Sequence, residues 1–167
     1  WMEWKGTLSL RPETFYQIAF DVCESLKRHG IEHIFICNGH AGNGSLLGQM
    51  DRFREELGID VRFHSYWEAY SEEFVNEHLT SGDCPAHAAE FETSVALAAF
   101  PGNAHWDNVN YDAESFDIQW EHYREQDPVY PYAARDLATP AKGRIMIDAA
   151  ANWVANQVKN MRGDPVS

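Results

Sequence analysis

The spacing of apolar residues predicts that the chain opens with an amphipathic helix. Apolar side chains recur every three to four positions in this segment, at Phe15, Ile18, Ala19, Val22 and Leu26. This period places them on one face of a helix, which we expect to cover a core. Pro12 suits the first turn of the helix, and the basic residues before Gly30 suit its last turn and its end.

Two short segments have the pattern of strands. Residues 31–37 (IEHIFIC) are rich in Ile and Phe and are expected to form a strand buried in a sheet, and residues 60–66 (DVRFHSY) alternate apolar with polar side chains. A second helical stripe lies between them and ends at Gly58, with apolar residues at Leu46, Leu47, Met50, Phe53 and Leu57. The order helix, strand, helix, strand predicts an α/β fold.

The second half of the chain is predicted to be mainly helical. We expect a short helix over 67–79, a helix that runs through Phe100 to the stop at Pro101, and a final helix over 139–163. Residues 103–138 have no sustained period and are interpreted as a long loop region. Residues 1–167 are expected to form a single domain.

Charge and composition narrow the function. The chain has 167 residues and a net charge of -13, from 26 acidic and 13 basic side chains, which disfavours binding to nucleic acid. Its three cysteines form no paired framework, and this favours a reducing, cytoplasmic setting. No apolar stretch has the length needed to cross a bilayer, so we expect no membrane partner.

His40 is the first candidate for chemistry. It lies in the glycine-rich stretch that follows the strand predicted over 31–37, a position where open α/β sheets place their sites. A neutral imidazole there is a good ligand for zinc or manganese. A single histidine in such a turn can equally be structural. The glycines do not match a phosphate-binding loop, because they lack the GxGxxG and Walker patterns.

A second group of candidates is formed by His87, Glu90 and Glu92, at the start of a predicted helix. If His87 is helical, Glu90 shares its face, whereas Glu92 lies about 140° away around the helix axis. If His87 precedes the helix, this restriction vanishes. Glu92 would lie over the small residues Ala96 and Ala99, where a carboxylate can be buried. Both glutamates could instead simply complement the positive end of the helix.

Cys84 offers an alternative chemistry. A thiolate close to a histidine can act as a nucleophile, so Cys84 with His87 would define a cysteine hydrolase. Pro85 separates the two in sequence, and no third group that would orient the histidine is evident.

Four stretches, in this order and spacing, resemble the creatininase family: GTLSLRP at 6–12, NGHAGN at 38–43, HAAEFETS at 87–94 and ATPAKG at 138–143. The resemblance implies a three-layer creatininase-like α/β fold, in which helices flank a mainly parallel sheet that is incomplete in this chain. It also implies a divalent metal, zinc first and manganese or iron as alternatives. The metal would activate water to hydrolyse a non-peptide C–N bond in a small molecule, such as a cyclic amide or a formamide.

The family's roles carry over to particular residues. His40 and Glu92 match positions of metal ligands, and His87 matches a histidine associated with proton transfer, so that His87 and Glu90 are the expected catalytic pair. The expected substrate-binding residues are Asn38, Gly39, Asn43 and Trp67. Trp67 could equally be a packing residue.

The sequence also departs from the family. The family's ExH motif and a later aspartate precede the GTLSL-like block, and this chain begins just before that block, so we expect an N-terminally truncated domain that alone binds metal weakly and hydrolyses little. The alternative is a non-catalytic fragment or subunit with an incomplete metal site. A homo-oligomer or a complementary N-terminal segment is the expected partner. Gly42 stands where the closest creatininases have a glutamate, which argues against creatinine as substrate.

Overall fold

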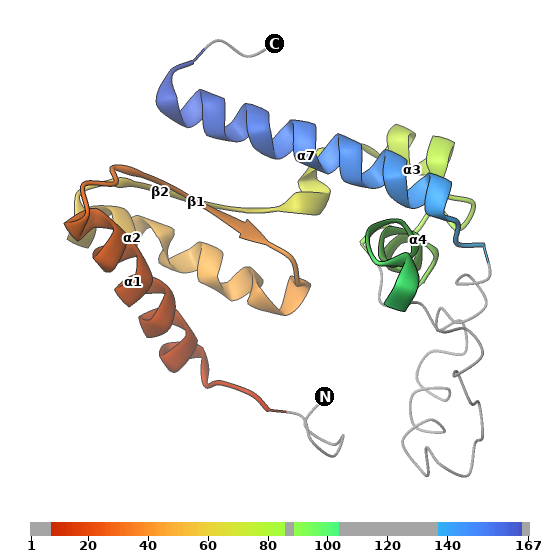
Figure 1. Ribbon diagram of the computed structural model, residues 1–167. Helices are drawn as coiled ribbons and strands as arrows, with labels where there is room; N and C mark the ends of the chain where they lie inside the picture. The colour runs from red at the N-terminus through yellow and green to blue at the C-terminus, as the bar shows by residue number, and fades with distance from the viewer. Residues whose placement is uncertain (1–7, 86–88, 104–136, 165–167) are drawn as a thin grey trace. The chain divides into compact units, whose positions relative to one another are not determined.

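A computed structural model of the protein describes residues 8–85, 89–103 and 137–164 (Figure 1). These residues form two compact units. Unit 1 comprises Trp1–Ala69 and Asn152–Ser167, and unit 2 comprises Tyr70–Ala151. The last helix, α7 (Pro140–Arg162), begins in unit 2 and ends in unit 1.

Unit 1 contains a parallel pair of strands, β1 (His33–Asn38) and β2 (Asp60–Ser65). His33 pairs with Asp60 at one end, and Asn38 pairs with Ser65 at the other. The strands are connected through the 3₁₀ helix η1 (Ala41–Gln49) and α2 (Met50–Leu57). Two parallel strands can be joined only by a long crossover connection, which is usually helical. The observed crossover is helical, and the predicted order helix, strand, helix, strand is confirmed.

Helices cover both faces of this pair. On one face, α1 (Pro12–Arg28), η1 and α2 enclose a core of buried side chains: Cys23, Ile34, Leu46, Met50, Phe53, Leu57, Val61 and Phe63. On the other face, Trp153 of α7 contacts Phe35 and His64, with ring centroids 6.5 Å and 5.7 Å apart. Unit 1 therefore has the three layers expected from the sequence.

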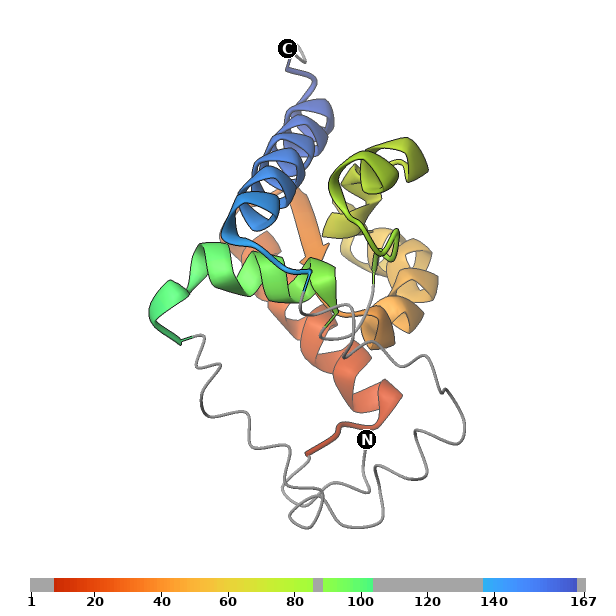
Figure 2. The ribbon, with the colours of Figure 1, turned by 90° about the vertical axis from the view of Figure 1, so that its right-hand side faces the viewer.

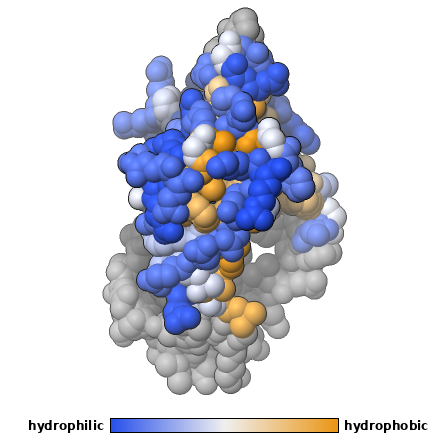
Figure 3. All heavy atoms as spheres, turned by 90° about the vertical axis from the view of Figure 1, so that its left-hand side faces the viewer, coloured by the Kyte–Doolittle hydropathy of each residue, from blue (hydrophilic) through white to orange (hydrophobic). Residues whose placement is uncertain are grey.

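The predicted stripe of α1 is confirmed in part, because Phe15, Ala19 and Leu26 pack against the core. Cys23 is buried, whereas Ile18 and Val22 are 49% and 54% exposed. Tyr16 and Phe20 pack against the core, and their large rings draw the buried face toward Cys23, which leaves Ile18 and Val22 at its edge. Figure 3 shows one face of the molecule on which apolar side chains form a narrow band among polar ones.

The strand predicted over 31–37 is confirmed as β1, although the structure buries it only in part. Ile34 is buried, but Ile31 and Cys37 are exposed. In the part of the chain that the structure describes, β1 has one neighbouring strand, so much of its length is uncovered. The alternation in β2 holds, with Val61, Phe63 and Ser65 buried.

Unit 2 is helical. It contains α3 (Glu72–His78), α4 (Glu90–Ala99), the short 3₁₀ helix η3 (Pro101–Asn103) and the first half of α7. The buried apolar residues of these elements include Val75, Leu79, Phe91 and Met146. Figure 2 shows α4 and α7 from a second side.

The helices α4 and α7 approach one another closely at Gly143. A Cβ atom at this position would overlap the carbonyl group of Ser94 and would come within 2.9 Å of the Ala98 methyl group. The Ser94 hydroxyl also accepts a hydrogen bond from the Thr139 N–H at 3.1 Å. Small residues on both helices therefore make this crossing possible.

The helices predicted over 67–79, up to Phe100 and over 139–163 are confirmed, the first of them as the 3₁₀ helix η2 (Tyr66–Ala69) followed by α3. The predicted loop region lies almost entirely outside the described residues. Within the described ranges, no helix combines the length and the apolar character that crossing a membrane requires.

Candidate functional site

Asn38 anchors the glycine-rich turn to the carboxyl ends of both strands. Its side chain is only 3% exposed, and its Nδ2 donates to the Ser65 hydroxyl at 2.9 Å. Its Oδ1 accepts from the backbone N–H of His40 at 3.1 Å and from Nδ2 of Asn43 at 3.3 Å. A buried amide needs such partners, and here they fix where the turn leaves the sheet.

His40 caps the start of η1. Its Nδ1 accepts a hydrogen bond from the Gly42 N–H at 3.0 Å. Because a backbone N–H can only donate, Nδ1 carries no proton here, and the neutral ring holds its proton on Nε2. A Cβ atom at Gly42 would lie 2.9 Å from this Nδ1, so glycine leaves the space that the cap occupies.

Trp67 lies at the same end of the sheet. It belongs to η2, which begins directly after β2, is half-buried, and meets Tyr66 edge to face at 5.2 Å between ring centroids. Glu68 holds this segment, because its carboxylate accepts from the Ser65 N–H at 2.7 Å and lies 2.8 Å from Nδ1 of His64. His40 and the four expected substrate-binding residues thus all lie in unit 1, at or shortly after the carboxyl ends of its two strands.

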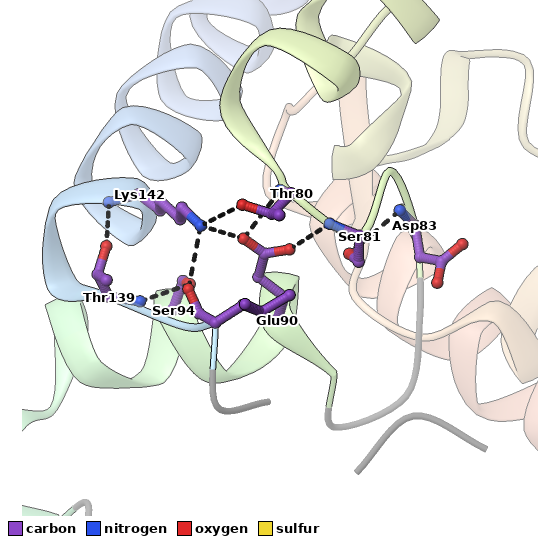
Figure 4. A network of polar contacts seen from close by, with 8 residues as sticks. Thr80, Ser81, Asp83, Glu90, Ser94, Thr139 and Lys142 are labelled. Carbon is purple, nitrogen blue, oxygen red and sulfur yellow. Dashed lines mark hydrogen bonds and ion pairs between the residues drawn. The ribbon is translucent and has the colours of Figure 1, made fainter. Parts of the chain in front are cut away.

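The acidic candidates lie on α4 in unit 2. Glu90 is completely buried, and Figure 4 shows its carboxylate among Lys142, Thr80 and Ser81. Burial acts to raise the pKa of Glu90, but the Lys142 ammonium and the N–H groups of Ser81 and Thr80 outweigh it, so the pKa lies below its usual value.

Glu92 lies on another face of α4. It is half-buried, whereas Ala96 and Ala99, which share its side of the helix, are exposed. Glu92 is thus only partly buried on this side of the helix. The small residues that allow close backbone approach are instead Ser94 and Ala98, opposite Gly143.

The donor chemistry of His40 and Glu92 suits a zinc or manganese ion. His40 belongs to unit 1 and Glu92 to unit 2, and His87 lies outside the described residues. Over residues 8–85, 89–103 and 137–164, no three His, Cys, Asp or Glu side chains gather closely enough to hold a metal ion. The described residues thus supply suitable ligands but no complete set.

The cysteine-hydrolase alternative is disfavoured by the environment of Cys84. Burial, together with the negative charge of Glu92, raises the pKa of this thiol to about 12. A nucleophilic cysteine needs the opposite, a thiolate stabilised by nearby positive charge.

We therefore expect Cys84→Ser to leave hydrolytic activity unchanged. We also expect iodoacetamide to alkylate Cys84 at pH 8 about a thousand-fold more slowly than a small free thiol, in line with the lower thiolate fraction. Peptide mapping after timed alkylation measures the rate. Rapid labelling of Cys84, or loss of activity in the serine variant, would contradict this assignment.

Ser65 and Lys142 are among the residues of these networks that were not predicted. Ser65 ends the alternating segment of β2, and nothing in that pattern distinguishes it. The role of Lys142 could have been predicted from its position in the first turn of α7, because the helix dipole disfavours a cation there. A lysine in that position indicates a specific acidic partner, and the structure shows that this partner is Glu90.

Solved structures share this architecture. A creatinine amidohydrolase (creatininase) structure is similar with a TM-score of 0.70 and 23% sequence identity, over 94% of this chain and 66% of that one. A mutant creatininase complexed with creatine is similar with a TM-score of 0.71 and 23% identity, over 95% and 68% of the two chains. A manganese form matches with a TM-score of 0.69 and 23% identity, over 94% and 67%. The fold is thus creatininase-like, and this chain spans about two thirds of those proteins.

The sequence itself matches the creatininase family model, described as creatinine amidohydrolase, over residues 1–158. No curated protein matches it. The chain therefore belongs to the creatininase family, and the resemblance seen in its four sequence blocks is confirmed.

Proposed function

We propose that this chain is part of a metal-dependent hydrolase that cleaves a non-peptide C–N bond in a small molecule, such as a cyclic amide or a formamide. Family membership supports a hydrolase of the creatinine amidohydrolase type. The observation that carries the proposal further is the anchored turn, because Asn38 holds His40 at the carboxyl end of two parallel strands. Ligand sites of open α/β sheets lie at that end.

His40 and Glu92 are the residues that would hold the metal. Zinc is our first assignment, with manganese or iron as alternatives, and both a zinc form and a manganese form occur among the similar creatininase structures. A divalent ion in such a site lowers the pKa of a bound water and polarises a carbonyl oxygen. The remaining ligands must come from outside the described residues or from a second polypeptide, because the described ones lack a third.

The other residues bind, orient and move protons. His87 is proposed to protonate the leaving nitrogen, a task for which an imidazole is suited near neutral pH. Gly39, Asn43 and Trp67 are proposed to line the substrate site at the carboxyl end of the sheet. Asn38 supports this site through His40, because both polar atoms of its amide are bound within the turn and the sheet.

The test combines metal content with hydrolysis. The full chain is incubated with Zn²⁺ or Mn²⁺, alone and together with a complementary N-terminal segment. Its bound metal is measured by mass spectrometry, and hydrolysis of cyclic amides and formamides is followed. We expect His40→Ala to weaken metal binding and hydrolysis at least about 100-fold, because it removes a ligand. His29→Ala, on an exposed histidine that ends α1, is the matched control and should change neither. Unchanged metal affinity in His40→Ala would refute the proposed ligand.

A non-catalytic subunit is the second candidate. It is favoured by the absence of a three-ligand group from the described ranges and by exposed apolar side chains such as Leu8, Ile18 and Val22. It predicts that the full chain binds no metal by itself and forms a homo-oligomer or a complex with a complementary segment. Metal content and oligomeric mass, measured on the same sample, separate the two candidates.

A further inference from the structure

The carboxylate of Glu90 is bound from several directions by hydrogen-bond donors. Oε1 accepts from the Thr80 N–H at 3.0 Å and contacts Nζ of Lys142, while Oε2 accepts from the Ser81 N–H at 2.7 Å. Each of these partners is a donor, so the site is built for the ionised carboxylate. A buried charge is tolerated only with such pairing.

These bonds join two segments of unit 2. Glu90 is the first residue of α4, and its side chain holds the backbone at Thr80 and Ser81, nine to ten residues earlier. The two backbone N–H groups are therefore fixed relative to the start of α4.

Lys142 connects these two segments to a third one. Its Nζ also donates to the Thr80 hydroxyl at 3.1 Å, as Figure 4 shows, and to the Leu137 carbonyl at 3.0 Å. The ammonium thus connects the first turn of α7, Leu137 just before it, Thr80 and the start of α4. The lysine side chain is only 23% exposed, so solvent screens the pair weakly.

Glu90 and Glu92 point to different faces of α4. Residues two positions apart in a helix differ by about 200° around its axis, so burial of the carboxylate at position 90 directs position 92 to another face. This matches the exposure of the two side chains, because Glu90 is inaccessible and Glu92 is half-buried.

We propose that Glu90 and Lys142 are positioning residues that tie Thr80 and Ser81 to the start of α4 and fix the face on which α4 presents Glu92. Glu90, which the sequence suggested as catalytic, does not exchange protons with substrate. The proposal rests on the proposed function for Glu92, but its structural part is testable without metal or substrate.

Hydrogen–deuterium exchange on the full, metal-free chain provides this test. In Glu90→Gln and in Lys142→Met, we expect the amides of Thr80 and Ser81 to exchange about 10-fold to 100-fold faster, because charge-assisted bonds are lost. The double variant should exchange little faster than either single variant, since both break one network. Lys142→Arg should restore slow exchange, and Glu77→Gln on the exposed side of α3 is the control.

Catalysis separates positioning from proton transfer. In the active holoenzyme, we expect Glu90→Gln and Lys142→Met to lower kcat in parallel while the inflections of the pH profile stay in place. The proposal is overturned if Glu90→Gln keeps wild-type amide exchange, or if it alone removes an ionisation from the profile. If Glu90→Gln does not fold, the comparison of Lys142→Met with Lys142→Arg decides. If the chain binds no metal and shows no activity even together with a complementary N-terminal segment, the proposed function is refuted and the exchange result still stands.

Discussion

Gly143→Ala is expected to destabilise the protein by about 3 kcal/mol or more, through overpacking of unit 2. The added methyl group would overlap the Ser94 carbonyl, and a backbone group cannot move aside as a flexible side chain can. In an unobstructed helix the same change is stabilising by up to about 1 kcal/mol, because alanine is the better helix former. A loss of stability in Gly143→Ala would therefore indicate that α4 and α7 are in close contact at this position, and a gain would indicate that they are not.

Urea unfolding followed by circular dichroism measures this change. Gly48→Ala is the matched control, since nothing lies within 4 Å of a Cβ atom built at position 48 and its backbone is not left-handed. We expect the control to be as stable as the wild type or more stable by up to about 1 kcal/mol. A Gly143→Ala variant as stable as Gly48→Ala would show that α4 and α7 do not cross as described.

Phe53→Ala is expected to cost about 3 to 5 kcal/mol, because it empties the centre of the unit 1 core. Phe53 is 0% exposed, and its ring packs edge to face with Phe20 at 5.1 Å between centroids. Leu47→Ala is its control, as Leu47 lies on η1 just before α2 and is 58% exposed.

The two stripe positions are equivalent in the sequence pattern but not in the structure. Thermal and urea unfolding should show Phe53→Ala far below the wild type and Leu47→Ala within about 0.5 kcal/mol of it. Equal effects of the two substitutions would contradict the described orientation of the η1–α2 segment.

The helices and strands could be predicted from periodicity because local pattern and burial agree along most of the chain. The Pro12 start, the end of α2 at Gly58 and the alternation of Val61 and Phe63 all have local causes. The details of burial had no such local cause. The face of α1 depends on how Phe20 meets Phe53, which lies 33 positions away in sequence.

The candidate site could likewise be predicted only in part. The anchored turn could be anticipated from the NGH motif at the end of a strand, and the structure shows the hydrogen bonds that hold it. The position of Glu90 could not be derived, because two acidic residues in one helix turn look alike in sequence. Only the long-range partner Lys142, 52 positions away, distinguishes the buried glutamate from the half-buried one.

The cap on η1 has a consequence for any ion that His40 receives. The Nδ1 lone pair already accepts a hydrogen bond from the Gly42 N–H. The same lone pair cannot bind a metal ion at the same time. An ion on Nδ1 would displace that amide, and an ion on Nε2 would send the ring proton to Nδ1, which expels the amide as well. Coordination through either nitrogen would therefore release the cap on the first turn of η1. The apparent affinity for the ion would be lower by the stability of a helix cap, about 1 kcal/mol.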